Sequence, residues 1–406
     1  MTDTTDTIEA VFSFESPTLF KMDSKGKIRS WRIEAAGDSY RTLSGLHGGK
    51  ITVSKWSKCE PASQETAEEQ AIFEAKAELK KKLDREYYDN LADAQSGVPK
   101  MFKPMLAKDY EKEGKKVDAY IASGGRLYIQ PKLDGLRCVF TKAGGKSRQN
   151  QEYKSVAHIT ALLERFFERY PGAVLDGELY NHEFKAEFEK ITSLARREEF
   201  NAEQLEQVQA MLQYHIYDGF LTQEAKDQPF LKRFSNVVRA LTECGVELAS
   251  GEKGGTINIV SSLATSAPDK VEKFHARFLE DGYEGTIIRM NVGYENKRTE
   301  ALLKYKSFQT EEFKVLAVEE GNGNWSGAAK RIQIGNLDGS PFYDPDGKEI
   351  ECHAGMRGTY DAGVEFLKDA DKYIGGEVTI RYFGKTNGGL PRFPVAIDFH
   401  PEGRKD

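Results

Sequence analysis

The sequence is poor in cysteine and has no long apolar run. Its four cysteines lie far apart and none forms a C-x-x-C pair, so we expect neither a disulfide scaffold nor a zinc site, and a reducing compartment fits. No hydrophobic stretch approaches the roughly 20 residues that a membrane-spanning helix needs, and the acidic N-terminus lacks the apolar region of a signal peptide. We therefore expect a protein of the cytoplasm, including that of a virus-infected host, with no membrane partner.

An excess of basic residues is also missing. The formal net charge of −6 excludes a uniformly basic nucleic-acid coat. A local basic groove remains compatible with that value, because binding depends on the charge of one face rather than on the sum. At 406 residues the chain is too long for one ordinary core, so two or three domains are expected.

Strand-like alternation with glycine turns occupies residues 12–57, which predicts a small antiparallel sheet. A helix is predicted next, because Thr66 and Glu69 form a capping box and apolar residues follow at helical spacing. This module, residues 1–98, loosely resembles the small DNA-binding domains named for a Trp-Gly-Arg signature, which here reads Trp-Arg-Ile. DNA binding by the module and a purely structural sheet are both left open. The residues that carry the resemblance are Trp31, Arg32, Arg41, Lys55 and Trp56.

The rest of the chain changes in character twice. A linker near residues 94–100 precedes a region, 99–308, in which strands and helices alternate, and this predicts a mixed α/β domain. Over residues 309–406 strands dominate, with Gly-rich turns and one short helix, which predicts a small barrel of the oligonucleotide-binding (OB) type. The expected fold class is therefore multidomain α+β: a sheet-plus-helix module, a mixed α/β domain and a small β-barrel.

One lysine stands out in the stretch YIQPKLDGLRCVF, residues 128–140. The pattern predicts a strand, a loop broken by proline and Asp-Gly, and a second strand, with Lys132 in the loop and Asp134 and Arg137 close by. A free lysine, with a pKa of ~10.4, is neutral in about one molecule in a few thousand at pH 7. Desolvation or neighbouring cations would have to lower that pKa to make a nucleophile. A surface hairpin with a solvated lysine is the alternative.

Five further stretches supply groups that a reactive lysine could use. Residues 174–179 and 283–289 place carboxylates at strands, residues 214–218 alternate aromatic side chains, and residues 147–150 follow the hairpin with an arginine. The fifth stretch, residues 302–306, puts two lysines on one strand face. Cations for phosphates, carboxylates for Mg²⁺ or ribose and an aromatic face for a base are what nucleotidyl transfer onto lysine requires.

The order and spacing of these stretches resemble the motifs of ATP-dependent DNA ligases, within the superfamily of lysine nucleotidyltransferases that includes RNA ligases and mRNA-capping enzymes. The KPMLA stretch at residues 103–107 also resembles the opening of a ligase adenylation domain, and the resemblance covers about residues 100–400. It implies covalent attachment of AMP to Lys132, with Asp134 and Arg137 supporting the loop and phosphate contacts. Lys304 and Lys306 would bind the α-phosphate.

The resemblance also implies the remaining site positions. Gln130 would lie near the adenine edge and Tyr217 would stack on the base, while Arg148 and Glu178 would face the ribose or the nick. ATP and Mg²⁺ are the implied cofactors, with Glu284 and Glu178 as metal ligands. The implied partner is nicked double-stranded DNA, bound by a monomer. The implied DNA contacts are Arg137, Arg148 and Arg392.

The C-terminal part matches the family in residues 381–383 and 389–394 and then departs from it. Residues 398–401 read Asp-Phe-His-Pro where the family usually has an arginine and a basic-acidic tail. Contact with the pyrophosphate leaving group is therefore left open among four residues: Arg392, His400, Arg404 and Lys405.

The expected activity is ATP-dependent sealing of 5′-phosphate/3′-hydroxyl nicks in duplex DNA through a lysyl-AMP and a DNA-adenylate. Two other enzymes of the superfamily are alternatives, a capping guanylyltransferase, which would attach GMP, and an RNA ligase. A non-catalytic nucleic-acid-binding protein is the alternative from another class. The sequence does not assign a pathway among replication, repair and a viral programme.

Overall fold

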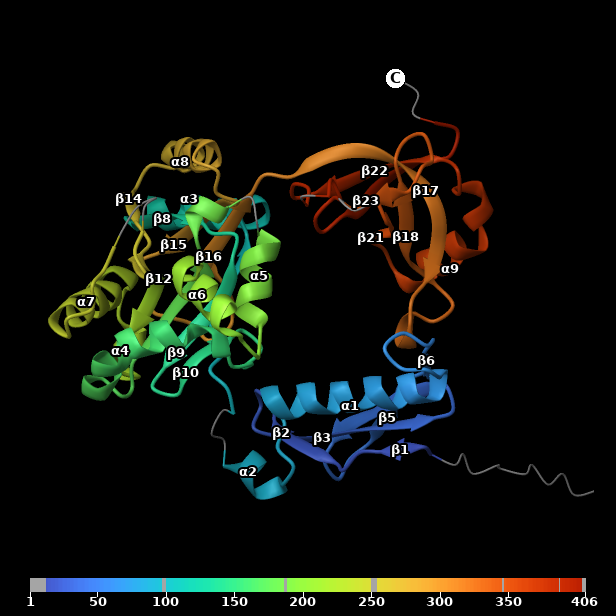
Figure 1. Cartoon of the computed structure of the whole chain (residues 1–406), viewed down its shortest axis with the longest axis horizontal. Coiled ribbons are helices and arrows are strands. Elements are labelled where there is room, and N and C mark those ends of the chain that lie inside the picture. The colour runs from blue at the N-terminus through green and yellow to red at the C-terminus, as the bar shows by residue number, and fades with distance from the viewer. Residues whose placement is uncertain are drawn as a thin grey trace, which may run out of the picture. The chain divides into compact units, whose positions relative to one another are not determined.

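The computed structural model describes residues 12–96, 100–185, 188–249, 254–344, 347–386 and 388–403. The chain divides into two compact units (Figure 1). One, which we call the central unit, is Phe102–Ser307, and the other combines Met1–Met101 with Phe308–Asp406. Within the ranges given above, no helix has both the length and the apolar character needed to cross a membrane.

The N-terminal module contains the expected sheet followed by a helix. Its six strands pair antiparallel, and they are β1 (Phe14–Glu15), β2 (Leu19–Met22), β3 (Ile28–Ala36), β4 (Ser39–Leu46), β5 (Ile51–Val53) and β6 (Ser57–Lys58). Helix α1 (Ala67–Arg85) follows, and the short helix α2 is Leu91–Gln95. The capping box between Thr66 and Glu69 is confirmed.

Most side chains that suggested DNA binding in this module have partners inside it. Trp31 is 5% exposed and belongs to the core between the sheet and α1. Arg32 and Arg41 both pair with Glu34, whose side chain is buried, and the Arg41 guanidinium lies 4.4 Å from the centre of the Trp56 ring. These contacts give Trp31, Arg32 and Arg41 a structural role in the module.

The central unit is built on two five-stranded sheets. The first has the order β10 (Gly144–Ser147), β9 (Leu136–Thr141), β11 (Val174–Tyr180), β12 (Gln213–Phe220) and β13 (Ile257–Ile259). The second has the order β14 (Leu263–Thr265), β8 (Leu127–Lys132), β15 (Gly285–Met290), β16 (Arg298–Lys306) and β7 (Leu106–Asp109). Six helices accompany them among the described residues, namely α3 (Tyr110–Ala122), α4 (Ala157–Arg169), α5 (Phe188–Arg196), α6 (Ala202–Met211), α7 (Phe230–Glu243) and α8 (Asp269–Glu280).

The first sheet is buried on both faces. Because side chains alternate along a strand, neighbouring residues of this sheet enter two different cores. Cys138, Phe140 and Leu175 point into a core formed with the helices, where α5 contacts β11 and α7 contacts β12. Val139 and Val174 point the other way, into a second core shared with strands of the second sheet. Helix α8 covers β15 and α3 covers β16 in this second layer (Figure 1). The first sheet therefore lies between two apolar cores.

The C-terminal part forms a closed five-stranded barrel. In barrel order its strands are β17 (Gln309–Glu320), β18 (Ala329–Gly335), β21 (Cys352–Gly355), β23 (Val395–His400) and β22 (Glu377–Tyr382). Helix α9 is Tyr360–Lys368, and strands β19 (Phe342–Tyr343) and β20 (Glu349–Ile350) form a small hairpin. Strands dominate here and one α-helix is present, as expected, and the interior is filled by apolar side chains such as Phe313, Ile332 and Ile380.

One local expectation was wrong. Lys132 was predicted in a loop, but β8 continues through Pro131 and ends at Lys132, which pairs with Gly285 of β15. Strand β14 pairs with β8 only as far as Ile129, so Pro131 lies where β8 has a single neighbour and its missing N–H disrupts no second ladder. The lysine is consequently held by a strand rather than by a loop.

Candidate active site

Lys132 and Lys306 share one carboxylate. Glu284 accepts a hydrogen bond from Lys132 Nζ on Oε2 and from Lys306 Nζ on Oε1. The three side chains are 21%, 16% and 13% exposed, in the order Lys132, Lys306 and Glu284. Burial opposes ionisation of Glu284, but the two ammonium groups outweigh it and lower the pKa of the carboxyl below its ordinary value. The pKa of Lys306 is lowered by its burial and by the charge of Lys132.

Gly285 allows Glu284 to reach the lysines. Its φ of +154° is a conformation that favours glycine, and a Cβ at this position would lie 2.3 Å from the carbonyl oxygen of Tyr305. The backbone N–H of Glu284 donates to the carbonyl oxygen of Lys132, at 3.1 Å, which ties the two residues together a second time. The backbone therefore fixes the carboxylate at the end of β8.

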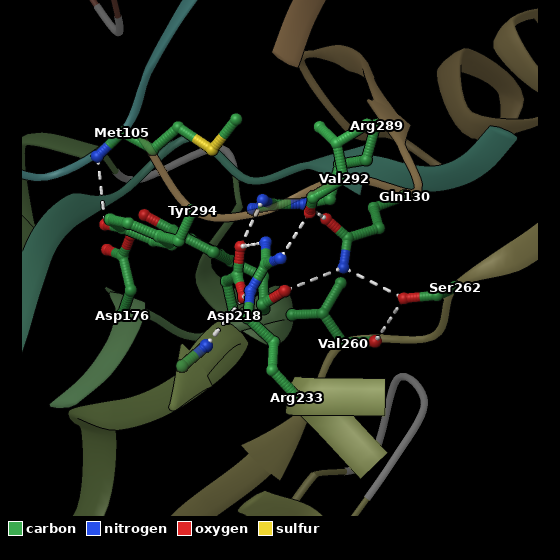
Figure 2. A network of polar contacts seen from close by, with 12 residues as sticks. Met105, Gln130, Asp176, Asp218, Arg233, Val260, Ser262, Arg289, Val292 and Tyr294 are labelled. Atoms are coloured by element: carbon green, nitrogen blue, oxygen red, sulfur yellow. Dashed lines mark hydrogen bonds and ion pairs between the residues drawn. The ribbon is translucent and has the colours of Figure 1, made fainter. Parts of the chain in front are cut away.

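Arg137 has a fixed partner in Asp176. Its guanidinium donates two hydrogen bonds to the fully buried carboxylate of Asp176, and Nε lies 2.8 Å from Oδ1. Tyr294 Oη also donates to Asp176, at 2.6 Å, and accepts a hydrogen bond from the backbone N–H of Met105, at 2.9 Å (Figure 2). The opening segment of the central unit is thereby linked to the strand pair that carries Arg137.

Tyr217 and Glu178 lie in the same region. Tyr217 Oη donates to Glu178 Oε2 at 3.3 Å, and the guanidinium groups of Arg137 and Arg289 lie 5.7 and 5.5 Å from the centre of the tyrosine ring. Burial raises the pKa of Glu178 to about 7, although the nearby charges of Lys132 and Arg137 oppose this rise. An aromatic face and a carboxyl that titrates near neutrality therefore adjoin the lysines.

A buried polar network around Gln130 and Asp218 (Figure 2) also includes the backbone carbonyl of Tyr217. Gln130 Nε2 donates to the carbonyl oxygen of Tyr217 at 3.0 Å and to Ser262 Oγ at 2.9 Å, while its Oε1 accepts from Arg289 Nε at 2.6 Å. Gln130 is 1% exposed. The hydrogens of its amide are thus committed to the protein, and the side chain supports the backbone of the tyrosine.

Asp218 is the centre of this network. Arg233 of α7 donates to both of its oxygens, at 2.9 and 2.8 Å, and Arg289 Nη1 donates to Oδ2 at 2.7 Å. The carboxylate is fully buried, which by itself would raise its pKa, but the two guanidinium groups reverse the shift and lower it. Two arginines around one carboxylate compensate a buried charge that alone would be strongly unfavourable.

The other expected site residues lie further from this group. Lys304 shares a face of β16 with Lys306, and its charge contributes to the lowered pKa of Lys306. Asp134 lies in the turn between β8 and β9, and Arg148 is exposed in the turn after β10. Arg392 belongs to the barrel, where its backbone N–H and C=O pair with Gly384 and Phe383.

Of the residues proposed for the leaving group, His400 contacts Thr379 Oγ1 at 3.0 Å within the barrel. Arg404 and Lys405 lie outside the described residues. Among the residues whose structure is described, no group of three or more His, Cys, Asp or Glu side chains could hold a metal ion by itself.

Sequence reasoning missed Tyr294 and Arg233. Tyr294 follows β15 in an irregular segment and gave no periodic signal. Arg233 did give one, because it lies within the apolar stripe of α7 formed by Phe230, Phe234 and Val237. A charge on the buried face of an amphipathic helix indicates a partner in the core.

The family of the chain follows from comparison with known proteins. Residues 104–306, half of the chain, match the family described as ATP dependent DNA ligase domain. The chain therefore belongs to this family, whose matched region coincides closely with the central unit and contains Lys132, Glu284 and Lys306.

The curated relatives of the chain are named as DNA ligases. A "DNA ligase" of Haemophilus influenzae is 25% identical over 269 residues, covering 65% of this chain and 83% of that protein. A "Probable DNA ligase" of Dictyoglomus thermophilum is 24% identical over 182 residues, which is 42% of this chain and 29% of that protein. The chain thus spans most of the first relative and less than a third of the second.

A solved structure from a study of Lig E DNA ligases is similar in fold, with a TM-score of 0.54 and 21% identity. The similarity covers 74% of this chain and all of that one.

Proposed function

We propose that this protein seals nicks in duplex DNA with ATP, through a covalent AMP on Lys132. The observation that carries the proposal is the arrangement of Lys132 and Lys306 on the two oxygens of Glu284, inside the matched ligase region. In the first step the ammonium group of Lys132 loses a proton to solvent, and the free amine attacks the α-phosphorus of ATP. The new P–N bond forms, and the bond to the β-phosphate oxygen breaks to release pyrophosphate. AMP then passes to the 5′-phosphate of the nick, and the 3′-hydroxyl displaces it.

The remaining side chains fit roles around that reaction. Lys304 and Lys306 would neutralise charge on the α-phosphate, and Tyr217 would stack on the adenine. Glu178, which Tyr217 holds, would face the ribose. Gln130 would contribute indirectly, by holding the backbone of Tyr217 near the adenine edge through its hydrogen bond.

Mg²⁺ fits the donors that are present. Mg²⁺ usually binds one or two protein carboxylates and takes its other ligands from water and substrate phosphates. Glu284 and Glu178 would supply two such carboxylates, although the described residues form no larger acidic cluster. The ion would polarise the phosphate oxygens and reduce their repulsion toward the attacking amine.

DNA would be bound mainly through its phosphates, because sealing any nick needs no base readout. Arg148 is exposed and available for such contacts, and Arg392 would contribute from the barrel. Arg137, already paired with Asp176, would present only the remainder of its guanidinium. We assign the chain three domains: a Trp-Gly-Arg-like module over residues 1–98, an adenylation domain over 99–308 and an OB-type barrel over 309–406 that would close over the nucleotide and then over DNA.

The test is sealing of a labelled nicked duplex by the purified monomer with ATP and Mg²⁺. We expect sealing of DNA, inhibition by increasing salt, and loss in Lys132→Ala. Equal or better sealing when the 3′-hydroxyl strand is RNA would favour the RNA ligase alternative. Retained sealing by Lys132→Ala would contradict the assigned nucleophile.

A further inference from the structure

His275, near the middle of α8, bridges two strands of the active site from behind. It is 5% exposed, and both of its ring nitrogens have partners. Nδ1 lies 2.9 Å from Thr286 Oγ1 of β15, and Nε2 lies 3.0 Å from Ser307 Oγ, just past the end of β16. The imidazole stacks on Tyr305, with ring centres 3.8 Å apart and planes 18° apart.

These partners adjoin the charged groups of the site. Ser307 follows Lys306 directly, and Thr286 lies two residues after Glu284. Thr286 and Tyr305 are paired across the ladder, so their side chains share the face that α8 covers. Alternation along β16 sends Lys306 to the opposite face. One imidazole on the covered face therefore contacts neighbours of both members of the Lys306–Glu284 pair.

The position of Ser307 gives this contact its importance. Lys306 is the last residue of β16, and the central unit ends one residue later, at Ser307. The ends of elements open more easily than their middles. The Ser307 side chain is hydrogen-bonded to His275. His275 therefore restrains the end of β16, where Lys306 lies.

The chemistry of the bridge suits a neutral imidazole. Burial lowers the pKa of His275, although Glu272 opposes the shift, and this favours the neutral ring with one donor and one acceptor nitrogen. Each hydroxyl partner can donate or accept, so both hydrogen bonds can form in either tautomer. No other side chain of similar shape offers two polar atoms in this arrangement.

We propose that His275 is a positioning residue that holds Lys306 against Glu284 for the nucleotidyl transfer to Lys132. This inference rests on the proposed function. A cation that neutralises a transferring phosphate must be held to within a fraction of an ångström, and misplacement by about 1 Å can cost on the order of 100-fold in rate.

Two amide variants separate the two hydrogen bonds. The nitrogen of an asparagine side chain takes the place of Nδ1, whereas that of glutamine takes the place of Nε2. His275→Asn would therefore keep the contact with Thr286 and lose Ser307, and His275→Gln would do the reverse. Lys273→Ala, on the same helix, is the matched control, because the Lys273 side chain is 74% exposed.

The experiment is a single-turnover measurement of lysyl-AMP formation with ATP and Mg²⁺. It includes the wild type, the two His275 variants, Ser307→Ala, the double variant His275→Asn/Ser307→Ala and the control. The amplitude reports the fraction of folded, active protein, and the rate constant reports positioning. We expect the rate constant of His275→Asn and of Ser307→Ala to fall about tenfold, with no further loss in the double variant. His275→Gln and Lys273→Ala should stay within about threefold of the wild type.

Rate constants unchanged in both His275→Asn and Ser307→Ala would overturn the inference, and so would losses that multiply in the double variant. A fall in amplitude alone would also overturn it, because it would indicate only a folding role. Failure of the wild type to form any adduct would instead contradict the proposed function itself, and this inference with it.

Discussion

Lys132 and Lys306, which are 174 positions apart in sequence, donate to opposite oxygens of a single carboxylate, that of Glu284. Glu284 thus brings two cations together, and under the proposed function they would neutralise the charge of the phosphate. Its own ionisation is secured by those cations, which lower its pKa. The arrangement is mutual, so removing the carboxylate charge should affect both lysines at once.

The first prediction concerns this carboxylate. Glu284→Gln keeps the shape of the side chain but leaves two neighbouring ammonium groups without their shared anion. We expect the rate of lysyl-AMP formation to fall about 100-fold, in the range seen when one preorganised electrostatic contact is removed from an active site. The rate is measured in a single turnover with saturating ATP. Glu300→Gln, which changes an exposed surface ion pair, is the control and should leave the rate unchanged.

The second prediction concerns the pH dependence of stability at Glu178, whose pKa is about 7 in the folded protein. An unfolded chain has a glutamate pKa of ~4.3, so between these values the folded state binds the extra proton. Stability therefore falls as pH rises from about 4.3 to about 7. Urea unfolding of the wild type and of Glu178→Gln at several pH values should show that the variant lacks part of this decline. Identical pH dependence of the two proteins would contradict it.

The third prediction concerns Arg233 and Asp218, which pair in the core through two hydrogen bonds. Arg233→Met should reduce the free energy of unfolding by about 3–5 kcal/mol, because Asp218 is left partly uncompensated. The double variant Arg233→Met/Asp218→Asn should recover part of this loss. Arg239→Ala, exposed on the same helix, should change stability by less than about 0.5 kcal/mol. Chemical denaturation gives all four values, and a double variant no better than the single one would argue against charge as the cause.

The fourth prediction concerns the N-terminal module. Deletion of residues 1–98 should weaken binding of nicked DNA more than it slows lysyl-AMP formation, if the module contributes to DNA recognition. Fluorescence anisotropy with a labelled nicked duplex measures the first quantity, and adduct formation measures the second. Equal loss of both would instead contradict this prediction and indicate that the module supports folding.

The clustering of Lys132, Glu284 and Lys306 was predictable because these residues lie at strand ends with a clear pattern. The stretches around Lys132, Glu284 and Lys306 each combine apolar alternation with a charged residue, and paired strands bring them together. The side-chain partners of Gln130 were not predictable, because Tyr217 and Arg289 are 87 and 159 positions away in sequence.

The helical contributors were harder to foresee for a similar reason. Helix α7 was not predicted, so the charge of Arg233 on its apolar face was not noticed. His275 lies in α8, but a single polar residue on a covered face has no spacing that distinguishes it. Contacts made by such residues depend on how helices pack on the sheets, and a strand or helix pattern does not specify that packing.

Covalent attachment of AMP to Lys132 is tested by the intact mass of the protein after incubation with Mg²⁺ and either ATP or GTP. The Lys132→Ala variant is measured alongside. The protein must first be shown to be folded and free of AMP. We expect the mass to increase by one adenylyl group with ATP, and to stay unchanged with GTP or in the variant. An adduct of GMP would point to a capping enzyme, and no adduct with either nucleotide would contradict the catalytic role of Lys132.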